Sequence, residues 1–176
     1  MLSMDIQRES EDPAPGDAAL HAAVRAAIEI AGVETAGIET SGVNAELPLE
    51  LSLRIVDAPE IRALNKRYRG RDAATNVLSF PAELPPGLPF RHLGDVIVCA
   101  GIVQTEAETQ NKTLEAHWAH MLVHGTLHLL GYDHEDDEEA EIMEALEAQA
   151  LARLGWPCPY GSELSAPATQ SMEALQ

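Results

Sequence analysis

Three histidines in segment 124–134 have the spacing of a metal site. His124 and His128 are four residues apart, so on a helix their rings lie one turn above the other and can bind one ion. Gly131 can end such a helix in the left-handed conformation and let the chain bring His134 to the same point. Three imidazoles with an open fourth position are typical of a catalytic zinc site, because a structural site normally uses four protein ligands. The alternative is three unrelated polar residues on a buried helix, and the spacing with the glycine favours the metal site.

The chemistry that this site predicts is hydrolysis. A zinc ion held by three neutral imidazoles lowers the pKa of a bound water towards about 7 and polarises a carbonyl or phosphoryl oxygen. The spacing equals that of the metzincin peptidases, in which a glutamate directly after the first histidine is the general base. Here that position is Gly125, so a peptidase would lack its proton acceptor. For a phosphodiester, the attacking group stays open between hydroxide at the metal and the 2′-hydroxyl of RNA.

A basic patch lies outside this segment. Five of the eleven Lys and Arg residues fall close together, namely Arg62, Lys66, Arg67, Arg69 and Arg71. The net charge is −18, and eight acids crowd positions 135–147. A compact basic patch on such an acidic protein suits an anionic ligand bound at one place. A solvated helix face explains the basic patch equally well. A phosphodiester needs a cation opposite the metal, and Arg69 could supply a bidentate clamp with Arg71 beside it, while the patch holds a single strand.

Two further polar residues are candidates for substrate contact. Asp95 begins an expected strand, where acids are more often turn residues. His117 lies two turns before His124, too far along a helix axis for the same ion, and a packed core histidine is an equally good interpretation. Cys99 and Cys158 predict no disulfide framework and a reduced, cytosolic compartment.

The chain of 176 residues is long enough for one domain. The helices and strands that must position these residues are predicted from the periodicity of its apolar residues. Strands are predicted at 4–7, 47–56, 75–81 and 93–100, and helices at 17–31, 59–69, 101–110, 114–130 and 136–154. Gly32 is expected to end the first helix. Tyr68 is expected to face inwards from the second, and Ile142 to open the core stripe of the last. No apolar run is long enough to span a bilayer, and no signal pattern begins the chain.

Taken together, the motifs resemble the YbeY endoribonucleases, also called ribosomal RNA maturation factors. The resemblance runs from about Leu51 to Tyr160 and is weak in the first third. It rests on Tyr68-Arg69-Gly70, Thr75 to Pro81, Leu93-Gly94-Asp95, His117 to Met121, His124 to His134 and Asp137-Glu138-Ala140-Glu141. It implies a zinc-dependent, single-strand-specific endoribonuclease that acts in small-subunit ribosomal RNA maturation and ribosome quality control. One zinc ion per chain would be bound by His124, His128 and His134, with Arg69 as the functional arginine. Arg71 stands where many members have lysine.

The resemblance also implies an α+β fold. A small mixed sheet of about four strands would pack against about five helices, with metzincin-like topology. From the length we expect a single domain over 1–160, and from the lack of any pattern a mobile tail over 161–176. The expected partners are single-stranded ribosomal RNA and the small subunit in the cytoplasm, and no membrane. Two other classes stay open. One is a non-enzymatic ribosome assembly factor with a structural zinc, and the other is a hydrolase acting on a small phosphoester or a peptide.

Overall fold

A computed structural model describes residues 1–34, 48–85 and 87–161. Within these residues the chain forms four strands and five helices. In chain order they are β1 (Leu2–Arg8), α1 (Asp17–Glu34), β2 (Leu49–Val56), α2 (Ala58–Arg69), β3 (Val77–Pro81), β4 (Arg91–Cys99), α3 (Ala100–Thr109), α4 (Leu114–Leu129) and α5 (Asp137–Arg153). All nine were expected from the sequence, with ends that differ by a few residues. The expected tail after residue 161 and the start of the second strand at Leu47 lie outside the described residues.

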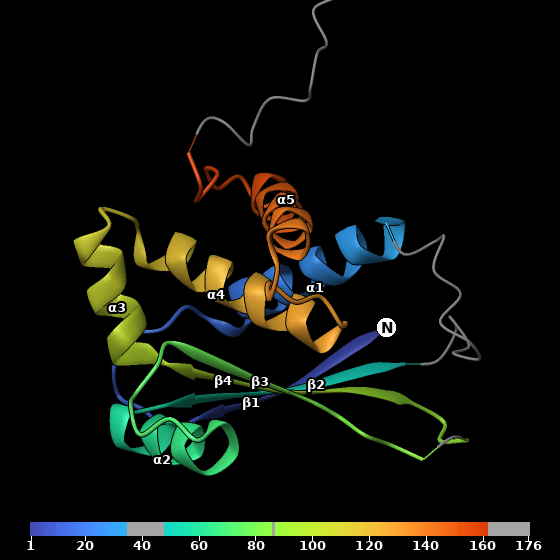
Figure 1. Cartoon of the computed structure of the whole chain (residues 1–176), viewed down its shortest axis with the longest axis horizontal. Helices are drawn as coiled ribbons and strands as arrows, with labels where there is room; N and C mark the ends of the chain where they lie inside the picture. Colours follow the sequence, from blue (N-terminus) through green and yellow to red (C-terminus); the bar gives the residue numbers. More distant parts are fainter. Residues whose placement is uncertain (35–47, 86, 162–176) are drawn as a thin grey trace, which may run out of the picture.

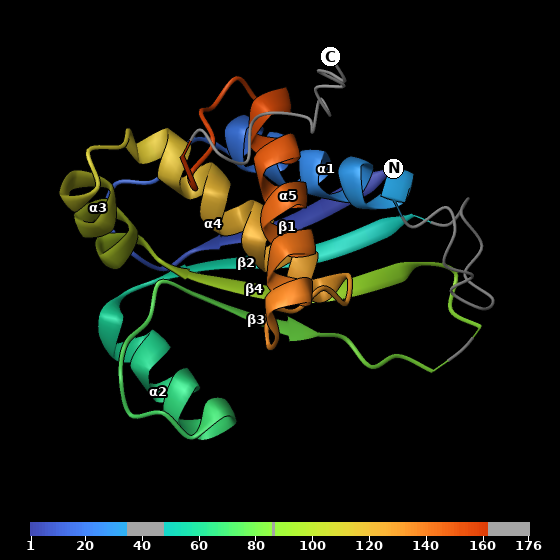
Figure 2. The same ribbon diagram turned by 45° about the horizontal axis from the view of Figure 1, so that its top comes forward.

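The strands form one mixed sheet in the order β1-β2-β4-β3. β1, β2 and β4 run parallel, and β3 pairs antiparallel with β4. Figure 1 shows α1, α4 and α5 above one face of this sheet and α2 alone on the other face, and Figure 2 shows the same layers from a second direction. This confirms the α+β fold with a small mixed sheet, whereas its likeness to metzincin topology stays a prediction.

The two faces of the sheet bury two separate apolar clusters. Leu51, Leu53 and Ile55 of β2 alternate along the strand and pack against the three-helix layer, together with Trp118 of α4. The smaller cluster on the α2 side has the following members: Val56, Ile61, Leu78, Ile97 and Cys99. Each fully buried large apolar side chain contributes roughly 1.5–3 kcal/mol to folding. α4 is therefore held between the sheet and two helices, and this fixes where its histidines lie.

Three sequence predictions about these elements were wrong. Gly32 does not end α1, which continues to Glu34, because Gly32 is not in the left-handed conformation that a stop requires. Tyr68 is 55% exposed, with its ring against the edge of Phe80 at the rim of the sheet. Ile142 is 50% exposed. The adjacent apolar Met143 takes the inward position in place of Ile142, whereas Leu146 and Ala150 of the expected stripe are buried as predicted.

Two further findings concern membrane-spanning helices and the cysteines. No helix among the described residues is long and apolar enough to cross a bilayer. Cys99 is buried and Cys158 is half-buried, and both thiols are free, as the sequence predicts.

Candidate metal centre

The ends of α4 are fixed by local interactions that the sequence indicates. Thr113 precedes the helix, and its Oγ1 accepts a hydrogen bond of 3.1 Å from the backbone N–H of Ala116. At the other end Gly131 adopts φ +98°, a conformation that a side chain would disfavour. The chain therefore leaves the helix axis directly after Leu130 and turns back over the last helical turn. This turn brings His134 beside His128, as predicted.

The three histidines converge on one point. Their ring centroids are 4.6 Å apart for His124 and His128, 5.1 Å for His128 and His134, and 5.5 Å for His124 and His134. One nitrogen from each ring lies within 4.8 Å of the others. The Nε2 atoms of His124 and His128 are 3.1 Å apart, close to the roughly 3.3 Å between two nitrogens on a tetrahedral zinc ion with bonds of 2.0–2.1 Å. The residues present therefore fit a metal ion.

The surroundings of His128 favour the neutral form of the ring, which binds metals. Burial lowers the pKa of His128, and the neighbouring rings of His124 and His134 lower it further. His134 is exposed, and its backbone N–H donates a 2.8 Å hydrogen bond to Oδ1 of Asp133, which stabilises the turn. His124 and His128 are half-buried. The site is thus open to solvent on the side of His134, and a substrate can approach it there.

A carboxylate that the sequence analysis missed lies behind the metal site. Glu147 of α5 is completely buried and accepts a hydrogen bond from Nδ1 of His124. It also contacts His120 and the hydroxyl of Tyr160. Burial alone would raise the pKa of Glu147, but the hydrogen bonds from His120 and His124 lower it to about 2. A signal existed in the sequence, because Glu147 interrupts the apolar spacing of Met143, Leu146 and Ala150 on α5.

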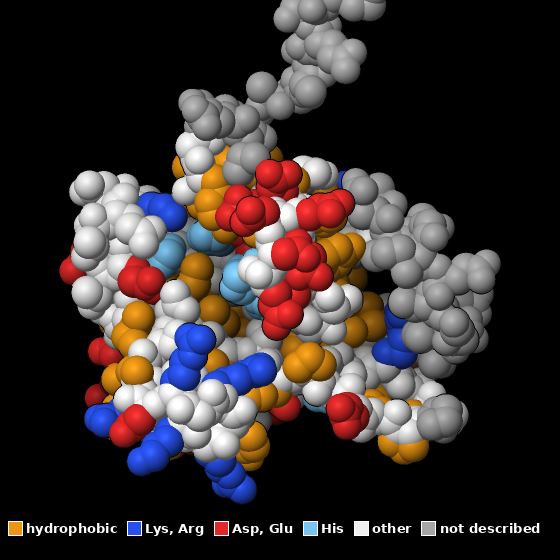
Figure 3. All heavy atoms as spheres, viewed as in Figure 1, with side chains coloured by type: hydrophobic (Ala, Val, Ile, Leu, Met, Phe, Trp, Pro, Cys, Tyr) orange, Lys and Arg blue, Asp and Glu red, His pale blue; other side chains and the backbone are white. Residues whose placement is uncertain are grey.

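A cleft of about 690 Å³ opens beside the three histidines. Its opposite wall carries Arg69 and Arg71. The Nη2 of Arg69 donates a 2.7 Å hydrogen bond to the carbonyl oxygen of Ser79, and the guanidinium lies 5.2 Å from the centre of the Phe80 ring. Figure 3 shows histidine side chains in a hollow between the acidic side chains over the start of α5 and basic side chains nearer α2. One wall of the cleft is therefore basic and the other acidic.

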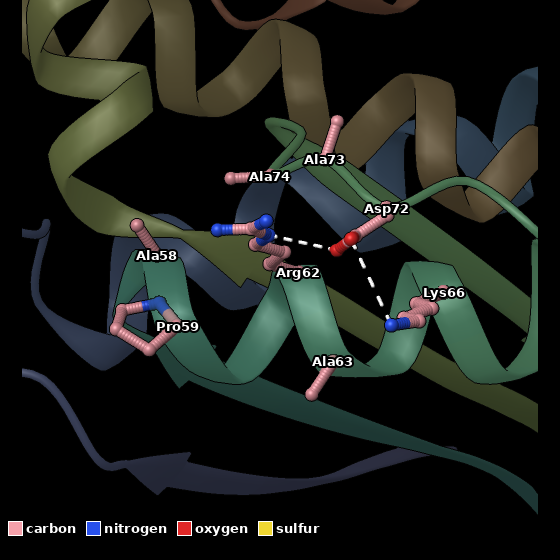
Figure 4. A pocket seen from close by; sticks show the side chains of 8 residues that line it. All are labelled: Ala58, Pro59, Arg62, Ala63, Lys66, Asp72, Ala73 and Ala74. Carbon is pink, nitrogen blue, oxygen red and sulfur yellow. Dashed lines mark hydrogen bonds and ion pairs between the residues drawn. The ribbon is translucent and has the colours of Figure 1, made fainter.

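The rest of the basic patch does not line this cleft. Arg62 and Lys66 line a separate groove between α2 and the segment that follows it, where both pair with Asp72 at 2.8 and 3.7 Å (Figure 4). The guanidinium of Arg67 lies over the ring of Tyr68, 5.1 Å from its centre. The structure thus separates Arg69 and Arg71, which lie near the metal site, from the three other members of the patch.

The two remaining candidates also lie away from the metal site. Asp95 pairs with Phe80 across the sheet, and by strand alternation it points to the α2 side, opposite the histidines. His117 is 2% exposed, and its Nε2 lies 3.5 Å from Oε1 of Glu106 on α3. Burial lowers the pKa of His117, and the Glu106 carboxylate acts in the opposite direction.

α4 lies close against the sheet at Gly125. A Cβ atom at this position would lie 3.0 Å from Cγ1 of Val96, 3.1 Å from Oγ of Ser79 and 3.3 Å from Cγ2 of Val77. The Ser79 hydroxyl donates a 2.9 Å hydrogen bond to the Gly125 carbonyl oxygen. At the position that carries the general base in metzincins, any side chain would meet the sheet at its Cβ, so a glutamate would require the neighbouring side chains to shift.

Three comparisons relate this chain to known proteins. The family model described as "Endoribonuclease YbeY" matches residues 9–155. An Endoribonuclease YbeY of Cellvibrio japonicus (strain Ueda107) is 63% identical over 111 residues, which are 63% of this chain and 63% of that protein. The alignment thus spans less than two thirds of that relative. The solution structure of TM1509 from Thermotoga maritima matches with a TM-score of 0.51 and 26% identity, over 87% of this chain and 92% of the other.

Proposed function

Because this chain belongs to the YbeY family, we propose that it is a metal-dependent endoribonuclease that hydrolyses phosphodiesters of single-stranded RNA. The main support for the proposal is that three converging histidines and Arg69 line the same cleft. We further propose that the substrate is small-subunit ribosomal RNA, and that the protein acts in its maturation and in ribosome quality control in the cytoplasm. The relatives that carry the name endoribonuclease support the reaction class.

The proposed metal is one zinc ion per chain, bound by His124, His128 and His134. Three imidazole nitrogens within 4.8 Å of one another, two of them 3.1 Å apart, suit zinc, and nickel or cobalt would also accept this ligand set. When bound, the ion would activate water and neutralise charge on the phosphate. The protein supplies the rigid spacing of the three rings, through the last turn of α4 and the turn at Gly131.

Arg69 has a different part in the proposed reaction. Its hydrogen bond to Ser79 and its position over Phe80 hold the guanidinium at the cleft while other N–H donors of the fork can face the substrate. A guanidinium can bind two non-bridging phosphate oxygens and stabilise the charge that develops on them. Arg71 lines the same cleft and could bind a neighbouring phosphate.

Cleavage of RNA by the Arg69→Ala variant tests this proposal. We expect a loss of about 10²–10³-fold in rate, the range found when a single charge-stabilising donor is removed, with metal content unchanged. Arg62→Ala is the matched control, because Arg62 belongs to the same helix but pairs with Asp72 outside the cleft. Full activity of Arg69→Ala would exclude the proposed role of this arginine.

A substrate panel separates the proposal from the other two classes. Single-stranded RNA, duplex RNA and peptides are offered to the purified, metal-loaded chain, with His128→Ala as the metal-site control. We expect cleavage of the single-stranded RNA alone, and none by His128→Ala. A protein that binds metal tightly but cleaves none of these would instead be an assembly factor with a structural ion, and cleavage of peptides would indicate a hydrolase of another class.

A further inference from the structure

We propose that Glu147 is a positioning residue of the metal centre, and that it sets the affinity for the metal by acting through His124. The inference rests on the proposed metal site and goes beyond its three ligands. Glu147 comes from α5, whereas His124 and His128 come from α4 and His134 from the turn after it. Its carboxylate therefore ties a second helix to the metal site.

The first step of the argument concerns the two nitrogens of His124. Nδ1 is directed to Oε1 of Glu147, and a carboxylate at this position accepts the Nδ1 proton. The hydrogen bond thereby selects the tautomer in which Nε2 is unprotonated. Nε2 is the atom that lies 3.1 Å from Nε2 of His128, at the point where the rings converge. Glu147 thus fixes both the rotation of the ring and the nitrogen that is free to bind a metal.

The second step concerns what holds Glu147 itself. Its other oxygen, Oε2, accepts a hydrogen bond from the hydroxyl of Tyr160 and lies 3.3 Å from Nε2 of His120. Burial and the carboxylate both raise the pKa of Tyr160, so its hydroxyl keeps the proton that it donates. Glu147 is therefore bound from α4 on one side and from the segment after α5 on the other, and it has little freedom to move.

The third step concerns the charge. Glu147 is 0% exposed, and among the described residues its ion-pair partners are histidines, with no lysine or arginine within pairing distance. A buried carboxylate without a cation is costly. A metal ion on the far side of the His124 ring would supply the missing positive charge and strengthen the N–H donor. A cation on the other side of the imidazole would therefore stabilise this buried anion further, beyond its hydrogen bonds to His124 and Tyr160.

Metal affinity of the Glu147→Gln variant tests the inference. We expect the dissociation constant for zinc, measured by competition with a chromophoric chelator, to rise about 10–100-fold. The visible absorption spectrum of the cobalt-loaded variant should also differ from that of the wild type, because the His124 nitrogen becomes a weaker and less well oriented metal ligand. Glu141→Gln is the matched control, since it removes the same charge from an exposed position on the same helix, and its zinc affinity and cobalt spectrum should equal those of the wild type.

A second variant covers the case in which Glu147→Gln does not fold. Tyr160→Phe removes one donor to Oε2 and leaves His124 untouched, so we expect a smaller rise in the dissociation constant, about 2–10-fold. Unchanged zinc affinity and cobalt spectrum in the folded variants would overturn the inference. A wild type that binds metal tightly without cleaving RNA would overturn the proposed activity alone. A wild type that binds no metal would overturn both.

Discussion

Two histidines of α4, the buried His117 and the half-buried His120, lie beside an acid and take no part in the metal cluster. His120 contacts Glu147, and His117 lies against Glu106, whose carboxylate also accepts hydrogen bonds of 3.1 and 3.2 Å from the Asn76 side chain. The two histidine rings contact each other, with centroids 6.0 Å apart. The buried Glu147 and the half-buried Glu106 are thus each bound by residues of more than one element, and these polar contacts help to fix how the elements pack around the site.

The pKa of His117 leads to a prediction about stability and pH. Burial lowers the pKa of His117 in the folded state, and Lys112 and His120 act in the same direction while Glu106 opposes them. Below the ordinary pKa of about 6.5, His117 therefore takes up a proton in the unfolded state that it does not take up in the folded state. As the pH is lowered, the free energy of unfolding then falls by up to about 1.4 kcal/mol per pH unit. His117→Gln should lack this component. Its stability should fall less than that of the wild type between pH 7.5 and 5.5.

Urea denaturation at these two pH values, with chelator present, measures the difference. His21→Gln on α1 serves as the control for removing a histidine far from Glu106, and its curve should follow that of the wild type. Equal losses of stability in the wild type and His117→Gln over this pH range would contradict the prediction.

At the scale of elements, the contact between α4 and the sheet decides where the metal cluster lies. The helix lies close against β3 and β4 at Gly125, and a hydrogen bond from Ser79 to the Gly125 carbonyl oxygen links the helix to β3 there. Ser79 is also the residue whose backbone binds Arg69. β3 therefore aligns the histidine wall and the arginine wall of the cleft through a single residue.

Two glycines in helices should respond in opposite ways to alanine. Gly125→Ala places a methyl group against Val96, Ser79 and Val77 at once, and we expect a net destabilisation of about 1–3 kcal/mol. Gly32→Ala places its methyl group in open space within α1, and we expect a gain of up to about 1 kcal/mol from helix propensity. Urea denaturation of both variants measures the two effects. A gain in stability for Gly125→Ala would mean that the sheet can move away without cost.

How far the sequence predicts this molecule depends on whether a feature is local. The convergence of three histidines was predictable, because a four-residue spacing and a left-handed glycine are properties of one short segment. Glu147 was not found, because its partner His124 is 23 positions away and the orientation of α5 is set by packing. Ile142 was misplaced for the same reason: adjacent apolar residues offer two possible stripes, and only the contact with the neighbouring helices selects Met143.

The charge of the whole molecule limits how it can bind a polyanion. The chain carries a net charge of −18, and the acidic residues over the start of α5 border the cleft (Figure 3). Nucleic acid that does not enter the cleft would meet a repulsive surface. Of the five members of the basic patch, Arg69 and Arg71 line the cleft, while Arg62 and Lys66 are partly neutralised by Asp72. Few phosphates should therefore be bound.

The dependence of RNA affinity on salt concentration tests how many phosphates the protein binds. Each phosphate contact with a single strand contributes about −0.7 to the slope of log K against log salt concentration. Two contacts, from Arg69 and Arg71, predict a slope of about −1.4, whereas five would give about −3.5. Fluorescence anisotropy with a short single-stranded RNA and metal-free protein, in which no cleavage occurs, measures the slope. Arg71→Ala should halve it and Arg62→Ala should leave it unchanged. A slope near −3.5 that falls with Arg62→Ala would mean that the strand also crosses the groove at Asp72, so that binding RNA must break the ion pairs there.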